Sequence, residues 1–402
     1  MHVRELRPED LGTHKPIYAV WEITLRCDHA CAHCGSRAAR ARPDELTFAE
    51  LKAVGDALAE LGCREVTLIG GEAYLHPDAV ALTRHLKELG LWVSMQTGGR
   101  GLTEPICRAL AEAGMDAIGV SLDGPPEVHD VLRAARGSQT SAERALQIAA
   151  SLGLPITVNT QLNALTLPHL RWQYERMVAL EVRAWRLQLT VPMGRAADHF
   201  DWILQPYQLL EALDTMAELQ LDAVARAEAQ GLPASRAMHV HGSNNVGYFG
   251  AHEELLRSRP GGQSSCWGGC PAGTHVIGIE SDGRVKGCPS LPTAPYHGGT
   301  VRERPLQTIW REDRTVGFTR HQTSDDLWGF CAGCYYADIC RAGCNWTSHC
   351  TLGRRGNNPF CAHRAETLRD MGLRERVEPV QPPPGVPYDF GRMRIVVEPW
   401  QA

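Results

Sequence analysis

Three cysteines stand close together early in the sequence, at Cys27, Cys31 and Cys34, in the order C-x3-C-x2-C. Three thiolates on one short loop can hold three irons of a 4Fe–4S cube and leave the fourth iron open. A cluster with four thiolates only carries electrons, whereas an open iron can bind a substrate or cofactor. A structural zinc site is the alternative, with His29 or His33 as the fourth ligand. The spacing therefore predicts a metal centre and leaves its type open.

Glycine-rich, polar segments follow the next three predicted strands. The first pairs bare glycine backbone with one carboxylate, a combination that suits a ligand carrying an ammonium group. Each segment alone is a weak signal, because glycine-rich turns often simply end strands. The candidate ligand-binding residues in these segments are Gly70, Gly71, Glu72, Gln96, Thr97 and Ser121.

Alternating strands and helices across residues 18–190 must position these segments. Thr47 and Glu50 form a capping box before apolar residues at helical spacing. Strands are predicted at residues 19–24, 65–69, 92–96, 117–122, 155–162 and 185–190, and helices at 48–61, 78–89, 104–113, 141–152 and 167–180. Six such units predict a parallel sheet with right-handed crossovers, either doubly wound or an incomplete barrel. Ligands bind at the carboxyl ends of such strands, so all the candidate segments share the functional edge.

The overall composition excludes several classes of protein. The 402 residues are 43% hydrophobic and 22% charged, which excludes wholesale disorder and a collagen-like fibre. A net charge of −5 argues against a nucleic-acid partner, and no apolar run is long enough to span a membrane. The start has no apolar signal segment, and clustered cysteines in a reducing compartment bind metal or do redox chemistry. We therefore expect a cytoplasmic protein.

The chain changes character along its length. Nine of the fourteen cysteines lie from Cys266 to Cys361, where glycine and proline recur every few residues. Such a region buries little apolar surface and needs further stabilisation, most simply by bound metal clusters. The expected divisions are a barrel at residues 16–200, a helical bridging region at 201–265, a cysteine-rich domain at 266–375 and an extended, proline-rich tail at 376–402.

The early motifs resemble those of the radical S-adenosylmethionine (radical SAM) superfamily. They are CDHACAHC after the first predicted strand, GGEA after the second and VSLDGP after the fourth. The resemblance covers residues 16–197 and implies a partial (β/α)6 barrel, with S-adenosylmethionine chelating the open iron through its amino and carboxylate groups.

The same resemblance implies roles for the candidate residues. Glu72, with the Gly70 and Gly71 backbone, would receive the methionyl ammonium. The residues that would hydrogen-bond the ribose or carboxylate are Gln96, Thr97 and Ser121. His33 takes the usual aromatic position before the last cysteine, and Ala73 stands where the family usually has proline.

The later cysteines resemble the SPASM extension of these enzymes, in complete order. The resemblance implies two auxiliary 4Fe–4S clusters, three clusters in all. The ligands implied for the second auxiliary cluster are Cys331, Cys334, Cys340 and Cys361. Those implied for the first are Cys270, Cys288 and Cys344, with Cys266 as the fourth. Without Cys266, the first auxiliary cluster has an open iron.

Three cysteines remain outside these sets. Cys63 and Cys107 are expected to be inert buried thiols. Cys350 lies between two implied ligands and is a spare ligand, a catalytic hydrogen-atom donor or an inert thiol.

The resemblance implies reductive cleavage of S-adenosylmethionine to a 5′-deoxyadenosyl radical that takes hydrogen from a substrate. SPASM enzymes mostly modify ribosomally made peptides, so we expect a peptide-modifying maturase that forms a cross-link or thioether or inverts a residue. The expected partners are a precursor peptide, a flavodoxin- or ferredoxin-type electron donor and a separate leader-peptide recognition protein.

Three alternatives stay open. One is a sulfatase-maturating enzyme that forms formylglycine; those enzymes share HD-x-LR, here His129 to Arg133, but carry an acidic residue where this chain has Pro289. Another is a dehydrogenase for a small molecule or in cofactor biosynthesis. From a different class, an iron–sulfur electron carrier would form no deoxyadenosine.

Overall fold

The structure is a computed structural model that describes residues 4–400. Its strands are β1 (Tyr18–Thr24), β2 (Glu65–Gly70), β3 (Trp92–Thr97), β4 (Ala117–Ser121), β5 (Ile156–Leu162), β6 (Ala184–Leu189), β7 (His239–Gly242), β8 (Val276–Ile279), β9 (Arg284–Lys286), β10 (His297–Thr300), β11 (Leu373–Gln381) and β12 (Arg392–Pro399). Its α-helices are α1 (Phe48–Glu60), α2 (Ala79–Glu88), α3 (Glu104–Glu112), α4 (Pro126–Arg133), α5 (Ser138–Ser151), α6 (Leu170–Ala179), α7 (Gln208–Ala229), α8 (Glu253–Arg257), α9 (Thr293–Tyr296), α10 (Leu306–Glu312), α11 (Ala337–Cys340), α12 (Asn345–Leu352) and α13 (Ala362–Asp370).

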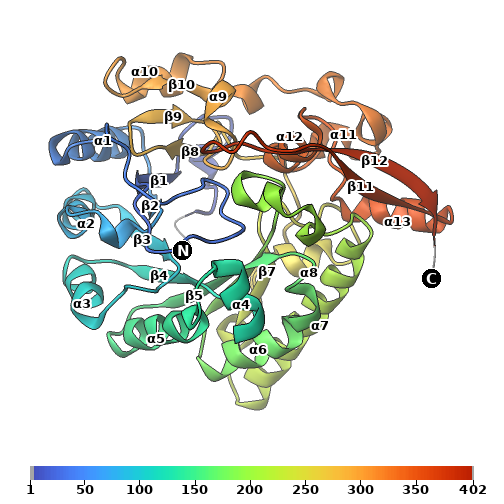
Figure 1. The fold of residues 1–402 in the computed structure, drawn as a ribbon, viewed down its shortest axis with the longest axis horizontal. Helices are drawn as coiled ribbons and strands as arrows, with labels where there is room; N and C mark the ends of the chain where they lie inside the picture. Colours follow the sequence, from blue (N-terminus) through green and yellow to red (C-terminus); the bar gives the residue numbers. More distant parts are fainter. Residues whose placement is uncertain (1–3, 401–402) are drawn as a thin grey trace.

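One curved sheet organises the molecule. Within residues 4–400 it has ten strands, in the order β10-β9-β8-β1-β2-β3-β4-β5-β6-β7. Strands β1 to β6 pair in parallel, each with the next, which confirms the six predicted β/α units. Helices α1, α2, α3, α5 and α6 follow one another around the outside of the sheet (Figure 1). The predicted fold class, a partial barrel, is confirmed.

Strand alternation separates the core from the barrel interior. Trp21, Leu68 and Val93 are fully buried in the main apolar core, which also includes Leu51 and Leu58 of α1. The capping box begins α1 as predicted, because the Glu50 amide donates to the Thr47 hydroxyl and the Glu50 carboxylate accepts from the Thr47 amide.

The cysteine-rich half continues the sheet of the barrel. Strand β8 pairs in parallel with β1, β9 and β10 add antiparallel strands beyond it, and β7 extends the opposite edge next to β6. Ile277 and Ile279 of β8 belong to the same core as β1. The cysteine-rich segment therefore gains apolar support from the barrel. The predicted domain boundaries stay predictions.

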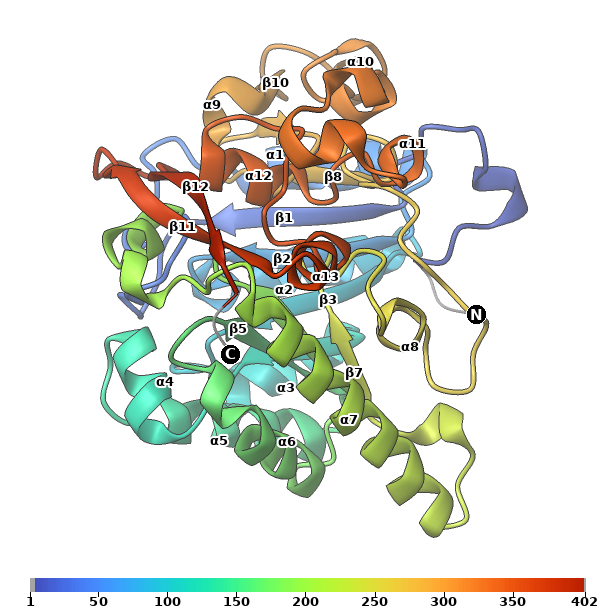
Figure 2. The ribbon, with the colours of Figure 1, turned by 90° about the vertical axis from the view of Figure 1, so that its right-hand side faces the viewer.

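The prediction of an extended C-terminal tail is wrong. Strands β11 and β12 form an antiparallel hairpin beside α13 (Figure 2). One face of the hairpin buries Val377 and Met393, and on β11 Arg374 and Arg376 pair with Glu398 of β12. Most of the prolines that favoured an extended tail instead occupy the loop between the two strands, and Pro379 lies within β11.

That loop is tied to the edge of the barrel. Arg37 donates to the Asp389 carboxylate at 2.8 Å, and the Gly194 amide donates to the Asp389 carbonyl at 2.7 Å. Among residues 4–400, no helix has the length and apolar character needed to cross a membrane.

A buried ion pair joins the hairpin to α13. Arg364 donates to Glu375 at 2.7 Å, and both side chains are buried. Removing one partner leaves an uncompensated buried charge, so Glu375→Ala should lower the free energy of unfolding by about 3–5 kcal/mol. Urea unfolding followed by circular dichroism measures this loss. The control is Glu378→Ala, which removes a solvent-accessible ion pair with Arg394 on the same hairpin and should change stability far less. Equal effects would contradict the assignment.

Candidate active site

A cavity of about 1120 Å³ lies at the carboxyl ends of the barrel strands. It brings together all the residues predicted to hold S-adenosylmethionine and the first cluster: Cys27, Cys31, His33, Cys34, Gly70, Gly71, Glu72, Gln96, Thr97 and Ser121. Its lining also includes residues that follow two cysteines of the C-terminal half, Pro289 after Cys288 and Trp346 after Cys344.

The loop that carries the three thiols is held by backbone contacts. The Cys27 amide donates to the Ala39 carbonyl at 3.1 Å, and Arg195 donates to the Cys31 carbonyl at 2.6 Å. Cys31 is buried, and Cys27 and Cys34 are half-buried. Burial raises the pKa of the Cys27 thiol to about 12 and that of Cys31 to about 11, so both are protonated thiols at neutral pH until a metal takes the place of the proton.

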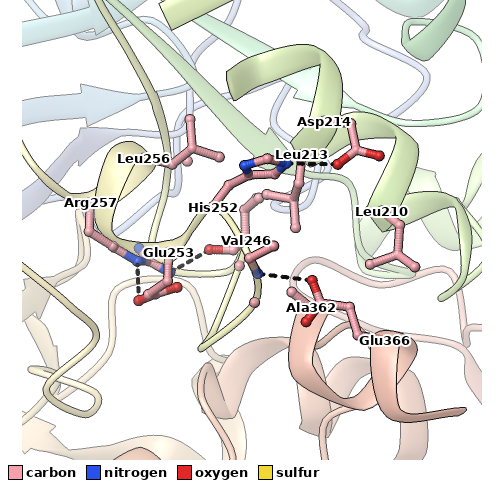
Figure 3. Close-up of a pocket in the computed structure, with 14 residues that line it drawn as sticks. Leu210, Leu213, Asp214, Val246, His252, Glu253, Leu256, Arg257, Ala362 and Glu366 are labelled. Atoms are coloured by element: carbon pink, nitrogen blue, oxygen red, sulfur yellow. Dashed lines mark hydrogen bonds and ion pairs between the residues drawn. The ribbon is translucent and has the colours of Figure 1, made fainter. Parts of the chain in front are cut away.

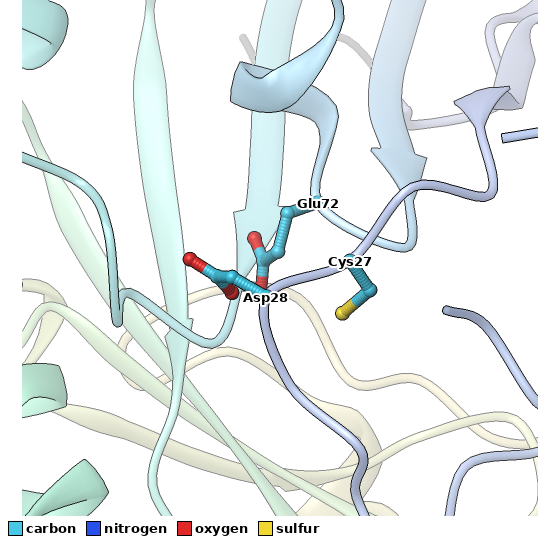
Figure 4. A group of neighbouring side chains, drawn as sticks. All are labelled: Cys27, Asp28 and Glu72. Carbon is cyan, nitrogen blue, oxygen red and sulfur yellow. The ribbon is translucent and has the colours of Figure 1, made fainter. Parts of the chain in front are cut away.

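The sulfur atoms of the three thiols are not all close enough together to share a single ion. Zinc bonds of about 2.3 Å would bring the sulfur atoms to within about 4 Å of one another. Among the described residues, the only set of three or more metal-ligating side chains with ligand atoms within 4.8 Å of one another is Cys27, Asp28 and Glu72 (Figure 4). Cys31 and Cys34 are not in that set. The predicted iron–sulfur ligands are therefore compatible with the structure.

A backbone carbonyl holds the His33 ring in one orientation and leaves its Nε2 atom as a hydrogen-bond acceptor or metal ligand. Its Nδ1 lies 3.0 Å from the Leu132 carbonyl, so this nitrogen carries the proton. Burial, with the nearby Arg133, lowers the pKa of His33 to about 4, and the ring is neutral at physiological pH. The side chain belongs to the thiol loop and lines the cavity, and its predicted role stays a prediction.

Glu72 lies buried at the end of β2. Its carboxylate accepts hydrogen bonds from the Thr97 hydroxyl at 2.5 Å and the Gly98 amide at 2.6 Å. Burial outweighs these two bonds and raises the pKa of Glu72 to about 7. A bound ammonium group would compensate the buried charge, which agrees with the predicted role. That role stays a prediction.

The other predicted cofactor residues line the same cavity. Gln96 accepts a hydrogen bond from the Asn159 side chain, and the lack of a side chain at Gly119 leaves room for its amide. Ser121 lies at the end of β4. The structure thus brings these residues together without testing which cofactor atoms they contact.

The ligands predicted for the second auxiliary cluster line one enclosed cavity of about 320 Å³. All four belong to it: Cys331, Cys334, Cys340 and Cys361. Their neighbours are mostly apolar, including Phe330 and Ala337. Four free thiols around one apolar cavity form a suitable donor set for a fully ligated 4Fe–4S cluster.

The group predicted for the first auxiliary cluster is only partly assembled. Burial, reinforced by the charges of Cys270 and Cys344, raises the pKa of Cys288 to about 12. Cys266 is exposed, and its role stays a prediction. Cys350 is fully buried on α12, where the charges of Cys344 and Cys288 add to the effect of burial on its pKa. The structure therefore places Cys350 near this group, and its role also stays a prediction.

Two family models match the sequence. The radical SAM superfamily model matches residues 21–180, and the SPASM iron–sulfur cluster-binding domain model matches residues 270–335. This chain belongs to the radical SAM superfamily and carries a SPASM domain. It is thus an enzyme of a superfamily whose members bind S-adenosylmethionine and iron–sulfur clusters, and the predicted cofactor classes are confirmed.

Curated relatives match over most of this radical SAM enzyme. An AdoMet-dependent heme synthase from Methanosarcina barkeri is 28% identical over 88% of this chain and 98% of its own length. A PqqA peptide cyclase from Rhizobium meliloti is 26% identical over 93% of this chain and 94% of its own length.

Solved structures share the fold. The structure of anSMEcpe with bound AdoMet has a TM-score of 0.66 and 17% identity, covering 88% of this chain and 95% of that one. Streptococcus suis SuiB bound to precursor peptide SuiA has a TM-score of 0.61 and 14% identity, covering 83% of this chain and 72% of that one.

Arg133 lines the cofactor cavity, a position that the sequence analysis did not predict. It ends α4, donates to Asp123 at 2.8 Å and lies 3.9 Å from Cys31 Sγ. Asp123 is anchored in turn by the Gln161 amide at 2.8 Å. This pair places a fixed guanidinium beside the thiol loop, where a positive charge favours thiolates and anionic ligand groups. The HD-x-LR pattern ends at Arg133 and could have pointed to it. The sequence analysis did not predict the short helix α4 that carries this residue.

Tyr248 is another missed residue. Its ring lines the cavity of the second auxiliary group, and its hydroxyl accepts a hydrogen bond from the Cys344 amide at 3.1 Å. It therefore lies between the two auxiliary thiol groups.

A separate pocket of about 390 Å³ lies between α7, α8 and α13 (Figure 3). His252 contacts Asp214 at 2.8 Å across it, and Glu366 accepts from the Ala251 amide. It shares no lining residue with the thiol-lined cavity and contains none of the predicted site residues.

Glu72→Gln should weaken S-adenosylmethionine binding by about ten- to a hundredfold, because a charge-assisted hydrogen bond contributes about 1.5–3 kcal/mol. Calorimetric titration of the reconstituted enzyme measures the affinity. Asp28→Asn is the control, since Asp28 lies beside Glu72 but accepts a hydrogen bond from Tyr74. Unchanged affinity in Glu72→Gln would mean that the ammonium is held elsewhere.

Proposed function

We propose that this enzyme is a maturase that uses radical chemistry to modify a ribosomally made peptide. The observation that carries the proposal is the shared wall of the cofactor cavity. Residues adjoining two auxiliary thiols, Pro289 beside Cys288 and Trp346 near Cys344, line the cavity that holds the predicted cofactor residues. A substrate in this cavity lies between the cofactor loops of the barrel and the SPASM domain.

The relatives support this choice of substrate. PqqA peptide cyclase is named for a peptide, and the solved SuiB structure contains a precursor peptide. The cavity itself is open and large, at about 1120 Å³, which leaves room for a chain segment beside a cofactor. A flavodoxin or ferredoxin as electron donor, a separate leader-peptide recognition protein and a cytoplasmic location complete the proposal.

The chemistry divides between cofactor and protein. Bound S-adenosylmethionine and its cluster supply a radical that removes hydrogen from an unactivated position. Glu72 and the glycine backbone of residues 70–71 orient the methionyl group, and Arg133 with Asp123 fixes the charge beside the thiol loop. Loops from both halves of the chain surround the substrate and limit its contact with water.

Cofactor biosynthesis is the second candidate. It is favoured by the heme synthase from Methanosarcina barkeri, which aligns over 98% of its length. A gene deletion separates the two candidates: loss of a modified peptide supports the maturase, whereas loss of haem with unchanged peptides contradicts it.

The direct test uses anaerobically reconstituted enzyme with S-adenosylmethionine, dithionite and short peptides encoded beside the gene. Mass spectrometry should find a peptide whose modification depends on the enzyme and coincides with deoxyadenosine release. Deoxyadenosine release without change in any of these peptides would contradict the proposed substrate.

Metal content tests the cluster ligands. The reconstituted enzyme should hold about twelve irons per chain, and replacing Cys27, Cys31 and Cys34 with alanine should remove about four of them together with cofactor cleavage. The matched control is Cys63→Ala, a buried thiol outside the predicted ligand sets. Stoichiometric zinc without iron–sulfur absorbance would refute the cluster assignment.

The second auxiliary cluster, predicted on the four thiols of the enclosed cavity, should be needed for modification of the substrate and not for cleavage of S-adenosylmethionine. A fully ligated cluster passes electrons but offers no iron to a ligand, so the Cys334→Ala, Cys340→Ala double variant should still release deoxyadenosine. Modified peptide should be absent. Product formation at the parent rate by the folded variant would make this cluster purely structural.

A further inference from the structure

A smaller cavity of about 400 Å³ adjoins the cofactor cavity. The two share a wall made by Ser36, Ile69, Gly70, Pro289 and Tyr388. Charged side chains from β1, β9 and the residue after β8 also line the smaller cavity. We call this smaller cavity the chamber; it adjoins the cofactor cavity and has charged residues of its own in its lining.

Glu22 of β1 is the carboxyl group that this chamber leaves incompletely bonded. Its Oε1 atom accepts from the Ser281 amide at 3.2 Å and from the Ser281 hydroxyl at 3.1 Å, and it pairs with Arg42 at 3.1 Å. All of these contacts fall on Oε1. Among the described residues, no hydrogen bond falls on Oε2, although the side chain is only 5% exposed. A carboxyl oxygen that accepts no hydrogen bond from the protein and belongs to a residue lining a cavity is positioned to meet a ligand.

The charged side chains next to Glu22 form ion pairs with one another. Lys286 pairs with Glu280 at 2.7 Å and donates to the Leu291 carbonyl at 2.7 Å. Arg42 also contacts Glu280 at 3.3 Å and Asp282 at 3.4 Å. These groups therefore set the field around Glu22 and leave its second oxygen available.

In this environment the pKa of Glu22 is close to neutral pH, which suits a general base. Burial raises the pKa of Glu22 to about 7, with Glu280 adding to the rise, while Arg42 and Lys286 oppose it. A folded-state pKa above the ordinary value means that the carboxylate form, which can take a proton, predominates only above about pH 7.

We propose that Glu22 is the general base that removes a proton from a substrate bound in the adjoining cavity. The inference rests on the proposed peptide modification, because joining two substrate atoms that both carry hydrogen requires one hydrogen to leave as a proton. In this step the bond to that hydrogen breaks, the proton bonds to Glu22 Oε2, and the electron pair left on the substrate atom forms the new bond with the substrate atom that has lost a hydrogen atom. One electron is then in excess, and it would pass to an iron–sulfur cluster, the class of acceptor that the proposed function assigns to the auxiliary thiols. Tyr388 and Pro289 line both cavities, so the reacting group lies at their shared wall.

The first test compares product formation with cofactor cleavage, using a peptide that the enzyme modifies in the mass-spectrometry experiment described under the proposed function. Glu22→Gln keeps the shape of the side chain but cannot take the proton, so product formation should fall by about a hundred- to ten-thousandfold. Deoxyadenosine release should persist. In the parent, kcat/KM should rise with pH through about 7, and this rise should be absent from the residual activity of the variant. Parent-like product formation in Glu22→Gln would overturn the proposal.

Two further variants separate catalysis from structure. Asp282→Asn makes the same charge change in the same cluster but lies outside the chamber lining, and it should keep product formation. Ser281→Ala removes one donor that stabilises the Glu22 carboxylate, so the rise in kcat/KM should move to higher pH. An unmoved profile in Ser281→Ala would contradict the role of Glu22.

Infrared spectroscopy tests the base without any peptide. The holoenzyme with S-adenosylmethionine should show a protonated carboxyl band that disappears as the pH rises through about 7. The band should be missing from Glu22→Gln and present in Asp282→Asn. If the band behaves in this way but no peptide is modified, the proposed function fails while Glu22 stays a base; if the band is unaffected by Glu22→Gln, the inference itself fails.

Discussion

The close approach of two loops, after β1 and after β2, is the contact on which the site depends. A Cβ atom at Gly71 would collide with the carbonyl of Arg26 and lie 2.8 Å from the Cys27 side chain, and one at Gly70 would collide with the carbonyl of Thr24. Because both positions are glycine, the Gly71 and Glu72 amides can donate to the Thr24 and Arg26 carbonyls, both at 2.8 Å. The thiol loop and the buried carboxylate of Glu72 therefore sit beside each other. Any side chain at residue 71 would force them apart.

The same strand β1 also carries the connection to the SPASM domain. Its other neighbour in the sheet is β8, which leads into Ser281, the partner of Glu22. One strand thus borders the cofactor loops on one side and the auxiliary half on the other. This arrangement explains how a cysteine-rich segment with little core of its own keeps a fixed position: it adds its strands to a sheet that is already buried.

Local patterns predicted much of this molecule. Apolar residues at helical spacing, a capping box and the regular succession of strand and helix segments located the six strands and most of the barrel helices, since helical periodicity reflects a buried face directly. The motif glycines and Glu72 were found because their types and order are unusual. Strand β7 was harder to predict, because its four residues carry too little periodicity and its pairing with β6 depends on residues far away in the sequence.

Other misses have a similar cause. The proline-rich loop near Tyr388 resembled a tail because the burial of Val377 and Met393 depends on the rest of the fold. Arg133 and Glu22 are ordinary charged residues in sequence, and only the folded chain shows that one faces the thiol loop and the other an enclosed chamber. The type of a residue predicts its chemistry, whereas its burial and its partners are set by tertiary contacts.

The contact between Arg37 and Asp389 joins residues that are 352 positions apart. Loop-closure entropy grows slowly with length, so this separation costs little stability, but contacts between such distant residues form late in folding. The barrel loop with its three thiols can therefore take shape while the hairpin that bears Tyr388 is still away from it. We expect an interval in biogenesis when iron and sulfide reach the thiol loop freely, before the hairpin docks and narrows the route by which a cluster is delivered.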